Sequence, residues 1–306
     1  MSSERLRVEL PTGQHKAVIG GMPIAYHVHG SGPVVLAHPG GPGGEWGYLR
    51  MPEVEKFATV VYVEPLGTGA SGRLENPGDY GLQLDASNVE GLRIHLGIEK
   101  FAFLGHSYGG FVALTYALAH PAHVSALILY DTSPTNGPDF DQDVGSNLQS
   151  FKDEPWFAEA TTAFQQLSRA QSDEELMATF ARVLPLYVAN WAERRNELEG
   201  RISRMRVCLE RAFRRKGDAP AVPGTPAGRP APHDSYDVRA RLGEIKAPTL
   251  VQVGAKDFIC SPKMAEVIHR GIAGSRLAVF PDTSHFAHIE TPQEYARTIR
   301  EFLSNV

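Results

Sequence analysis

The sequence predicts an α/β fold in which a mostly parallel sheet is covered by helices on both faces. Three observations support this prediction. Short, continuously apolar runs recur along the chain, stretches of helical periodicity separate most of them, and only the N-terminal part alternates polar and apolar residues instead. Runs that are apolar throughout are typical of strands buried on both faces, whereas alternation is typical of half-exposed antiparallel strands.

The N-terminal segment predicts an antiparallel hairpin. Residues 5–10 and 16–30 alternate polar and apolar side chains, and the pair Gly20-Gly21 interrupts the second stretch. Two glycines between alternating segments are typical of a tight hairpin turn.

Six apolar runs then predict the buried strands. They begin at residues 34, 59, 101, 126, 249 and 277 and are VVLA, TVVYV, FAFLG, ALILY, TLVQVG and LAVF. Residues 84–96, 108–119 and 262–270 lie between these runs and show helical periodicity, which predicts the covering helices.

The alternation of strands and helices stops between Asp131 and Leu242. We therefore predict that residues 1–131 and 242–306 form one core domain and that residues 132–241 form a helical cap inserted after the sixth strand. Two apolar stripes at helical spacing support the cap: Trp156, Phe157, Ala160, Phe164 and Leu167, and then Trp191, Leu198, Ile202, Met205, Leu209 and Phe213. Residues 217–234 are rich in Pro and Gly and predict a flexible return to the core.

Composition narrows the class of protein. The chain has 306 residues and a net charge of -5, so its overall charge does not favour binding to nucleic acid or to an anionic membrane. Residues 191–216 carry nine basic and four acidic side chains, which we interpret as a solvated basic helix face rather than an anion-binding surface. The two cysteines, Cys208 and Cys260, have neither disulfide-framework nor zinc-site spacing. With no apolar leader and no long apolar run, we expect a cytoplasmic protein of undetermined oligomeric state.

The segment Gly105-His106-Ser107-Tyr108-Gly109 lies between a predicted strand and a predicted helix. This is the context of a G-x-S-x-G nucleophile elbow, in which the glycines give the turn room and the serine hydroxyl is exposed at the strand end. We predict that Ser107 is a nucleophile. For the neighbouring His106 we expect a supporting hydrogen bond rather than proton transfer.

A serine hydroxyl needs an adjacent base that is itself oriented by an acid. In this kind of site the chain order is Ser, then Asp or Glu, then His. Asp257 follows the strand at 249 and His285 follows the last strand, so we predict that they are the acid and the base. Asp131 is the alternative acid and ranks second, while for His288 we expect a packed or solvated ring.

The glycine-rich stretch LAHPGGPGGEWGYL, residues 36–49, predicts the second part of such a site. The oxyanion that forms during acyl transfer needs two N-H donors, one of which is the backbone N-H of the residue after the nucleophile, here Tyr108. We predict that the other comes from Gly41, with Gly40 as the alternative.

With these motifs in place, the chain from about residue 18 to its end resembles the α/β-hydrolase superfamily. Within that superfamily, GGPG at 40–43, EPLGTGASG at 64–72 and GHSYGG at 105–110 are similar to the prolyl iminopeptidase-like branch. The resemblance implies a triad of Ser107, Asp257 and His285, a helical cap that helps to select the substrate, and no metal or organic cofactor.

The sequence departs from that branch at three places. Pro39 stands where the branch usually has histidine, so that His38 is displaced by one residue. Residues 64–67 are Glu-Pro-Leu-Gly instead of Asp-Gln-Arg-Gly, and Tyr108 replaces a tryptophan. The resemblance therefore supports the mechanism more strongly than the substrate.

We expect a cofactor-independent serine hydrolase that cleaves an ester, lactone or amide bond of a small molecule or short peptide through an acyl-enzyme. The alternative is a prolyl iminopeptidase-type aminopeptidase, in which Glu193 and Glu197 would bind the substrate amine. Gly40, His38 and Trp191 are further candidates for substrate contact. Carbon-carbon bond hydrolysis and cofactor-free haloperoxidase chemistry also use a serine, and a non-hydrolytic binding protein or isomerase is the remaining alternative.

Overall fold

The computed structural model describes residues 10–202, 205–214 and 235–306, without the side chains of residues 197–199 and 201–202. One eight-stranded sheet forms the centre of the molecule, in the order β1-β2-β4-β3-β5-β6-β7-β8. The first two pairings, β1 with β2 and β2 with β4, are antiparallel, and all the others are parallel. The strands are β1 (Gly13–Ile19), β2 (Met22–Gly30), β3 (Val34–His38), β4 (Thr59–Val63), β5 (Phe101–His106), β6 (Val124–Tyr130), β7 (Thr249–Gly254) and β8 (Arg276–Phe280).

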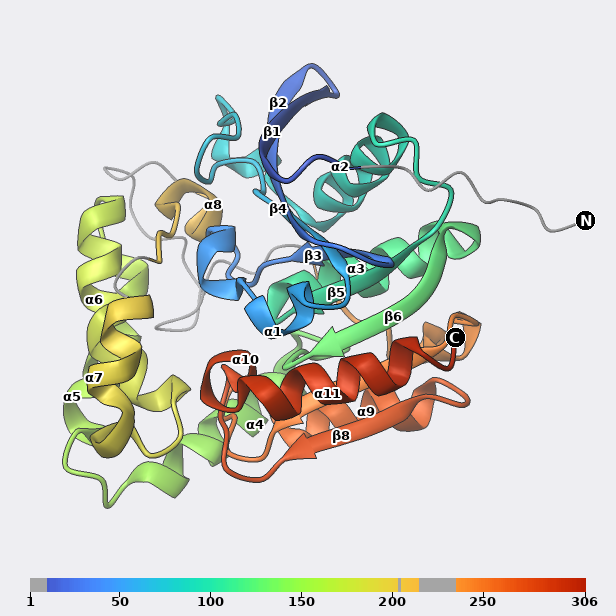
Figure 1. The fold of residues 1–306 in the computed structure, drawn as a ribbon. Helices are drawn as coiled ribbons and strands as arrows, with labels where there is room; N and C mark the ends of the chain where they lie inside the picture. The colour runs from blue at the N-terminus through green and yellow to red at the C-terminus, as the bar shows by residue number, and fades with distance from the viewer. Residues whose placement is uncertain (1–9, 203–204, 215–234) are drawn as a thin grey trace, which may run out of the picture.

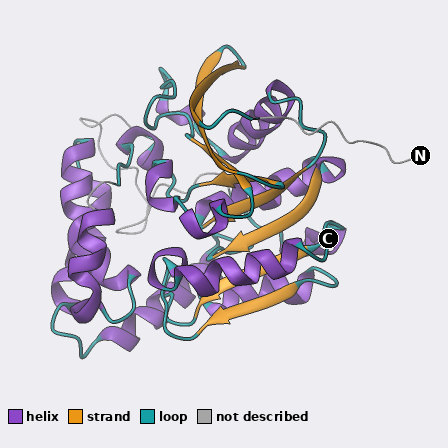
Figure 2. Ribbon diagram, in the orientation of Figure 1, coloured by secondary structure: helices purple, strands orange, loops and turns teal. Residues whose placement is uncertain are grey.

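Helices cover both faces of this sheet (Figures 1 and 2). One apolar core lies between the sheet and α2 (Leu82–His95), α3 (Tyr108–Ala119) and α9 (Pro262–Gly271). The other lies on the opposite face, under α1 (Pro52–Glu55) and α11 (Pro292–Leu303). Burial on both faces explains why the central strands are apolar throughout: every residue of β5 and of β7 is buried. The predicted fold class is confirmed.

The N-terminal hairpin forms as the alternation predicts. Ile19 pairs with Met22 across the Gly20-Gly21 turn, and both glycines have positive φ, at 58° and 81°. Such angles at two consecutive turn residues are those of the hairpin turns that match strand twist. Residues 5–9 of the predicted first strand lie outside the described residues.

A helical insertion follows β6 and precedes β7. Its helices are α4 (Pro138–Leu148), α5 (Phe157–Gln166), α6 (Asp173–Tyr187), α7 (Trp191–Ile202) and α8 (Leu209–Phe213). In Figure 1 they stand beside the sheet, with α5, α6 and α7 grouped at one end of the molecule. The Pro/Gly-rich residues 217–234 lie outside the described part of the chain.

The prediction of one apolar helical stripe from Trp191 to Phe213 is wrong in one respect. The described part of α7 runs to Ile202, residues 205–206 are not helical, and Val207 lies in an extended segment that pairs with Gly44. The N-H of Cys208 donates to the Gly43 carbonyl at 2.9 Å, so backbone bonds to the glycine-rich loop replace those of a helix. Helical periodicity in the side chains could not reveal a pairing with a loop about 160 residues earlier in the sequence.

Among the described residues, no helix combines the length and the apolar character needed to cross a membrane.

Candidate active site

Ser107 occupies a tight turn between the end of β5 and the start of α3. Its backbone has φ 55° and ψ -121°, a conformation that costs a residue with a side chain on the order of 1–3 kcal/mol. Neighbouring groups hold it there: the Ser107 N-H donates to the Tyr130 carbonyl at 3.0 Å, and the Thr132 hydroxyl donates to the Ser107 carbonyl at 2.7 Å. The turn separates the serine side chain from the strand and directs it into a pocket.

Two glycines permit the close packing around this turn. A Cβ at Gly109 would lie 2.2 Å from the His38 carbonyl oxygen, so only glycine lets α3 approach the end of β3 this closely. A Cβ at Gly40 would lie 2.8 Å from the Cβ of Ser107, so the glycine-rich loop passes directly beside the serine. The motif glycines thus bring the loop after β3 against the turn after β5.

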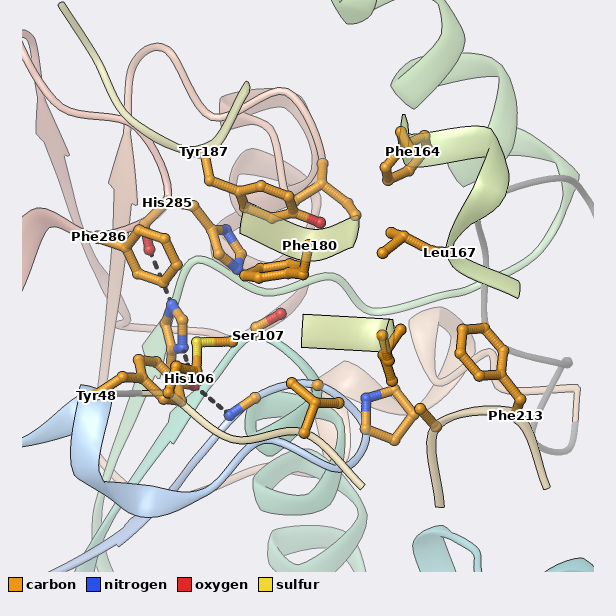
Figure 3. Close-up of a pocket in the computed structure, with 18 residues that line it drawn as sticks. Tyr48, His106, Ser107, Phe164, Leu167, Phe180, Tyr187, Phe213, His285 and Phe286 are labelled. Carbon is orange, nitrogen blue, oxygen red and sulfur yellow. Dashed lines mark hydrogen bonds between the residues drawn. The ribbon is translucent and has the colours of Figure 1, made fainter. Parts of the chain in front are cut away.

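His285 and Asp257 come from the loops after β8 and β7. The Nδ1 atom of His285 lies 2.7 Å from Oδ2 of Asp257, and both side chains are buried. The other carboxylate oxygen of Asp257 accepts the N-H groups of Ile259 and Cys260 at 2.9 and 3.1 Å. These bonds fix the carboxylate, which in turn orients the imidazole. His285 lines the same pocket as Ser107 (Figure 3).

Asp131, the alternative acid, lies at the end of β6 and is fully buried. One oxygen accepts the Gly254 N-H at 2.8 Å, and the other has no hydrogen-bond partner among the described residues. Burial and the neighbouring negative charge of Asp257 raise the pKa of Asp131 well above its usual range. Asp131 lies near His285, but the hydrogen bond to the imidazole comes from Asp257.

Tyr48 and His106 connect the glycine-rich loop to the His285 loop. The Gly40 N-H donates to the Tyr48 hydroxyl at 2.6 Å, and that oxygen lies 2.8 Å from Nδ1 of His106. Burial lowers the pKa of His106 well below its usual range, so the ring is neutral; Nδ1 accepts the tyrosine proton and Nε2-H donates to the His285 carbonyl at 2.9 Å. The sequence predicted a supporting role for His106, but nothing in it pointed to Tyr48. Because the Gly40 N-H is already used, Gly41 is the better candidate donor in this loop.

His288 and His38 are both buried, and neither lines the pocket with Ser107. The His288 ring lies between the Tyr130 hydroxyl at 2.9 Å and the Tyr48 carbonyl at 2.9 Å, which agrees with a packed ring. The His38 ring bonds the Pro39 carbonyl at 2.9 Å, and burial lowers the pKa of His38 to about 4.

The pocket above Ser107 is apolar. It has a volume of about 130 Å³ and lies between the glycine-rich loop, the His285 loop and the helical insertion (Figure 3). Its walls include Phe164, Leu167, Phe180, Tyr187, Phe213 and Phe286. Among the described lining residues there is no Asp, Glu, Lys or Arg. A site with these walls favours an uncharged group with an apolar body.

Besides His38, which was also a predicted substrate contact, two more of the predicted contacts lie outside this pocket. Trp191 and Glu193 line a second hollow of about 670 Å³, which reaches Asp257 and shares no described lining residue with the pocket at Ser107. The Glu193 side chain is exposed there. Glu193 therefore does not line the pocket at Ser107, and the side chain of Glu197 lies outside the described residues.

In the part of the chain that the structure describes, three clusters bring potential metal-ligating atoms within 4.8 Å of one another. Two of them consist of groups around His285 whose hydrogen bonds are given above. In the third, Glu90 lies beside His120 and His123, but its carboxylate already accepts two N-H groups of Arg93, at 2.9 and 2.7 Å, and the Tyr116 hydroxyl at 2.7 Å. A guanidinium paired with both oxygens opposes a bound cation, and we assign no metal to any cluster.

The sheet order, the strained serine turn and the three loops that meet beside it define an α/β hydrolase. A sequence model of the family described as alpha/beta hydrolase fold matches residues 33–292, and the chain belongs to that family.

Within the family, the chain is similar to proline iminopeptidases. The enzyme of that name from Saccharolobus solfataricus is 27% identical over 292 residues, which cover 92% of this chain and 88% of the relative. A 2-hydroxy-6-oxononadienedioate/2-hydroxy-6-oxononatrienedioate hydrolase from Cupriavidus pinatubonensis is 28% identical over 280 residues, 90% of this chain and 88% of the relative. The crystal structure of a proline iminopeptidase from Mycobacterium smegmatis superposes with a TM-score of 0.70 at 21% identity, covering 96% of this chain and 98% of the other. The protein is therefore a hydrolase of this fold.

Proposed function

We propose that this protein is a serine hydrolase that cleaves an ester or lactone with an apolar acyl group through an acyl-enzyme. One observation carries the proposal. Ser107 and His285 line the same apolar pocket, and Nδ1 of His285 is held by the buried carboxylate of Asp257.

In the proposed mechanism, Oγ of Ser107 attacks the substrate carbonyl while Nε2 of His285 accepts the hydroxyl proton. The carboxylate of Asp257 keeps the Nδ1 proton in place and stabilises the imidazolium. The backbone N-H groups of Tyr108 and Gly41 donate to the oxyanion. When the tetrahedral intermediate collapses, His285 gives its proton to the leaving oxygen; a water molecule, activated by the same imidazole, then hydrolyses the acyl-enzyme.

A fluorophosphonate probe and the Ser107→Ala variant test this mechanism. We expect the probe to label the wild-type protein at Ser107, and the substitution to lower kcat for p-nitrophenyl butyrate by about 10⁶-fold. Ser87, an exposed serine on α2 whose hydroxyl bonds the Gln83 carbonyl, provides the control substitution Ser87→Ala. A folded Ser107→Ala variant that loses only a few-fold in rate would exclude the serine as nucleophile.

Aminopeptidase activity is the second candidate, and the similarity to proline iminopeptidases favours it. A substrate ammonium in a water-excluded site needs a carboxylate partner, and the described walls of the pocket offer none. Comparison of prolyl nitroanilide with its N-acetylated form distinguishes the two functions. An amine-binding enzyme should lose more than about tenfold in kcat/KM on acetylation, because a hydrogen bond to a charged group worth at least about 1.5 kcal/mol is removed.

A further inference from the structure

Arg211, on α8 of the helical insertion, extends into the core domain as a buried cation. Its side chain is 1% exposed. One guanidinium nitrogen donates to Oδ2 of Asp85 on α2 at 2.6 Å, and another donates to the Leu66 carbonyl at 3.0 Å. A buried charge is costly unless it is paired, so this contact fixes the insertion to the core at one defined point.

Asp85 also connects Arg211 to Tyr108, the residue that follows Ser107. The carboxylate oxygen that binds Arg211 also accepts the hydroxyl of Tyr108, at 2.9 Å. The guanidinium carbon lies 5.9 Å from the centre of the Tyr108 ring. Tyr108 is the first residue of α3, and its backbone N-H is one of the two proposed oxyanion donors. Arg211 is therefore two hydrogen bonds away from the residue that supplies that donor.

The chain just before Arg211 holds the loop that supplies the other proposed donor. The Cys208 N-H donates to the Gly43 carbonyl, and the Glu45 N-H donates to the Arg206 carbonyl, both at 2.9 Å. A Cβ at Gly43 would lie 2.8 Å from the Cys208 carbonyl oxygen, so the glycine-rich loop and the segment around Cys208 pack closely. These bonds begin two residues after Gly41.

The same stretch forms part of the pocket wall. Met205, Val207, Ala212 and Phe213 all line the cavity above Ser107. We call residues 205–213 the clamp segment. It contacts the pocket, the glycine-rich loop and, through Arg211 and Asp85, the side chain of Tyr108.

We propose that Arg211 is a positioning residue for the oxyanion hole: by fixing the clamp segment, it aligns the N-H groups of Gly41 and Tyr108. This inference rests on the proposed function. Oxyanion donors act on charge that develops in the transition state, so their misalignment lowers kcat much more than it weakens substrate binding. A purely structural contact would instead lower the fraction of folded protein, or change KM through the pocket wall.

The test compares Arg211→Met, Arg211→Lys and Arg182→Met with the wild type. We expect Arg211→Met to lower kcat for p-nitrophenyl butyrate at least tenfold with KM within about twofold, and to weaken binding of butaneboronic acid, a tetrahedral analogue, in the same proportion. Arg211→Lys should restore part of kcat, because a lysine keeps the charge beside Asp85 but not the second, forked contact to Leu66. Arg182, half-exposed on α6 and paired with Glu159 at 3.2 Å, is the matched control and should leave both constants unchanged.

Tyr108→Phe is the second variant, because the loss of Arg211 leaves a buried carboxylate that can prevent folding. Tyr108→Phe keeps the ion pair between Arg211 and Asp85 and every backbone N-H, and it removes only the hydroxyl that joins Tyr108 to Asp85. We expect a several-fold lower kcat, and no further loss when it is combined with Arg211→Met if that variant folds. An unchanged kcat in folded Arg211→Met, or in Tyr108→Phe, would overturn the inference. Fluorophosphonate labelling distinguishes failure of the proposed function from failure of this inference. A wild-type protein that is not labelled contradicts the proposed function itself. A labelled wild-type protein together with an unaffected Tyr108→Phe variant contradicts only the role of Arg211.

Discussion

Ser107 and Asp131 share a backbone feature that few side-chain-bearing residues have: a positive φ, of 55° and 43°. Both stand directly after parallel strands that are neighbours in the sheet, β5 and β6. The carboxyl ends of parallel strands are where α/β proteins build their sites. The strain at these two positions is maintained by the surrounding hydrogen bonds and places one hydroxyl and one carboxyl group at the same edge of the sheet.

Substitution by asparagine should affect catalysis very differently at the two buried aspartates near His285. We predict that Asp257→Asn lowers kcat/KM for p-nitrophenyl butyrate by about 10⁴-fold, because the acceptor that orients the imidazole is lost. Asp131→Asn should change it by less than about threefold. Burial and the negative charge of Asp257 raise the pKa of Asp131, which disfavours its ionised form, and an asparagine oxygen can still accept the Gly254 N-H.

Circular dichroism of both variants provides the control for folding. A loss in Asp131→Asn far larger than that in Asp257→Asn would show that Asp131 is the acid on which His285 depends.

At the scale of elements, the loop after β8 is held by Glu290 of α10 (Ala287–Glu290). One carboxylate oxygen accepts the Ser284 N-H at 2.8 Å, and the other accepts the Ala189 N-H at 2.9 Å from the end of α6. The carboxylate therefore joins the segment that bears His285 to the helical insertion. Burial raises the pKa of Glu290 to about 7.

This raised pKa predicts how stability depends on pH. The folded protein keeps a proton on Glu290 up to about pH 7, whereas the unfolded chain loses it near its reference pKa of about 4.3. The contribution to folding is therefore complete below about pH 4.3 and is lost as the pH rises to about 7. We expect the difference in unfolding free energy between the wild type and Glu290→Gln to fall by about 2–3 kcal/mol from pH 5 to pH 8.

Urea unfolding at several pH values measures this difference. Glu266→Gln, at an exposed position on α9 where the carboxylate pairs with Arg270 at 2.5 Å, is the control. A difference between wild type and Glu290→Gln that is the same at pH 5 and pH 8 would show that Glu290 is not protonated in the folded protein.

Elements whose sequence signal is local were predicted well. The predicted helix at residues 108–119 agrees with α3, because an apolar strand, a G-x-S-x-G turn and a helical period follow one another without interruption. The clamp segment was not predicted, since its backbone partners, Gly43 and Glu45, are far away in the sequence. Nor did the sequence reveal Tyr48, whose role depends on two hydrogen-bond partners that only the fold brings together.

At the scale of the whole molecule, the pocket belongs to neither part of the chain alone. The core supplies Ser107, His285 and the glycine-rich loop as its floor, and the helical insertion supplies apolar walls such as Phe164 and Phe180. The insertion therefore forms much of the space above the serine. In the proposed function this space holds the acyl chain of the substrate.

The size and apolar character of this pocket predict a dependence on acyl-chain length. Each methylene buried is worth about 0.8 kcal/mol, which is about fourfold in kcat/KM. For p-nitrophenyl esters from acetate to octanoate we expect a rise of about fourfold per methylene until the volume of about 130 Å³ is filled. Longer chains should gain nothing or lose rate, because overfilling a packed site typically costs about 1–3 kcal/mol.

The variant Phe180→Ala tests whether the insertion sets this limit. Phe180 lies on α6 in the pocket wall, and its truncation should move the optimum to a longer acyl chain while lowering kcat/KM for the short esters that no longer fill the space. Phe57, whose ring lies 4.6 Å from the guanidinium of Arg300 and outside the pocket, provides the control Phe57→Ala, which should leave the chain-length profile unchanged. Equal rates for all chain lengths in the wild type, or an unchanged optimum in Phe180→Ala, would place the acyl group outside this cavity, since a group that fills it must sense both its length and the wall that Phe180 forms.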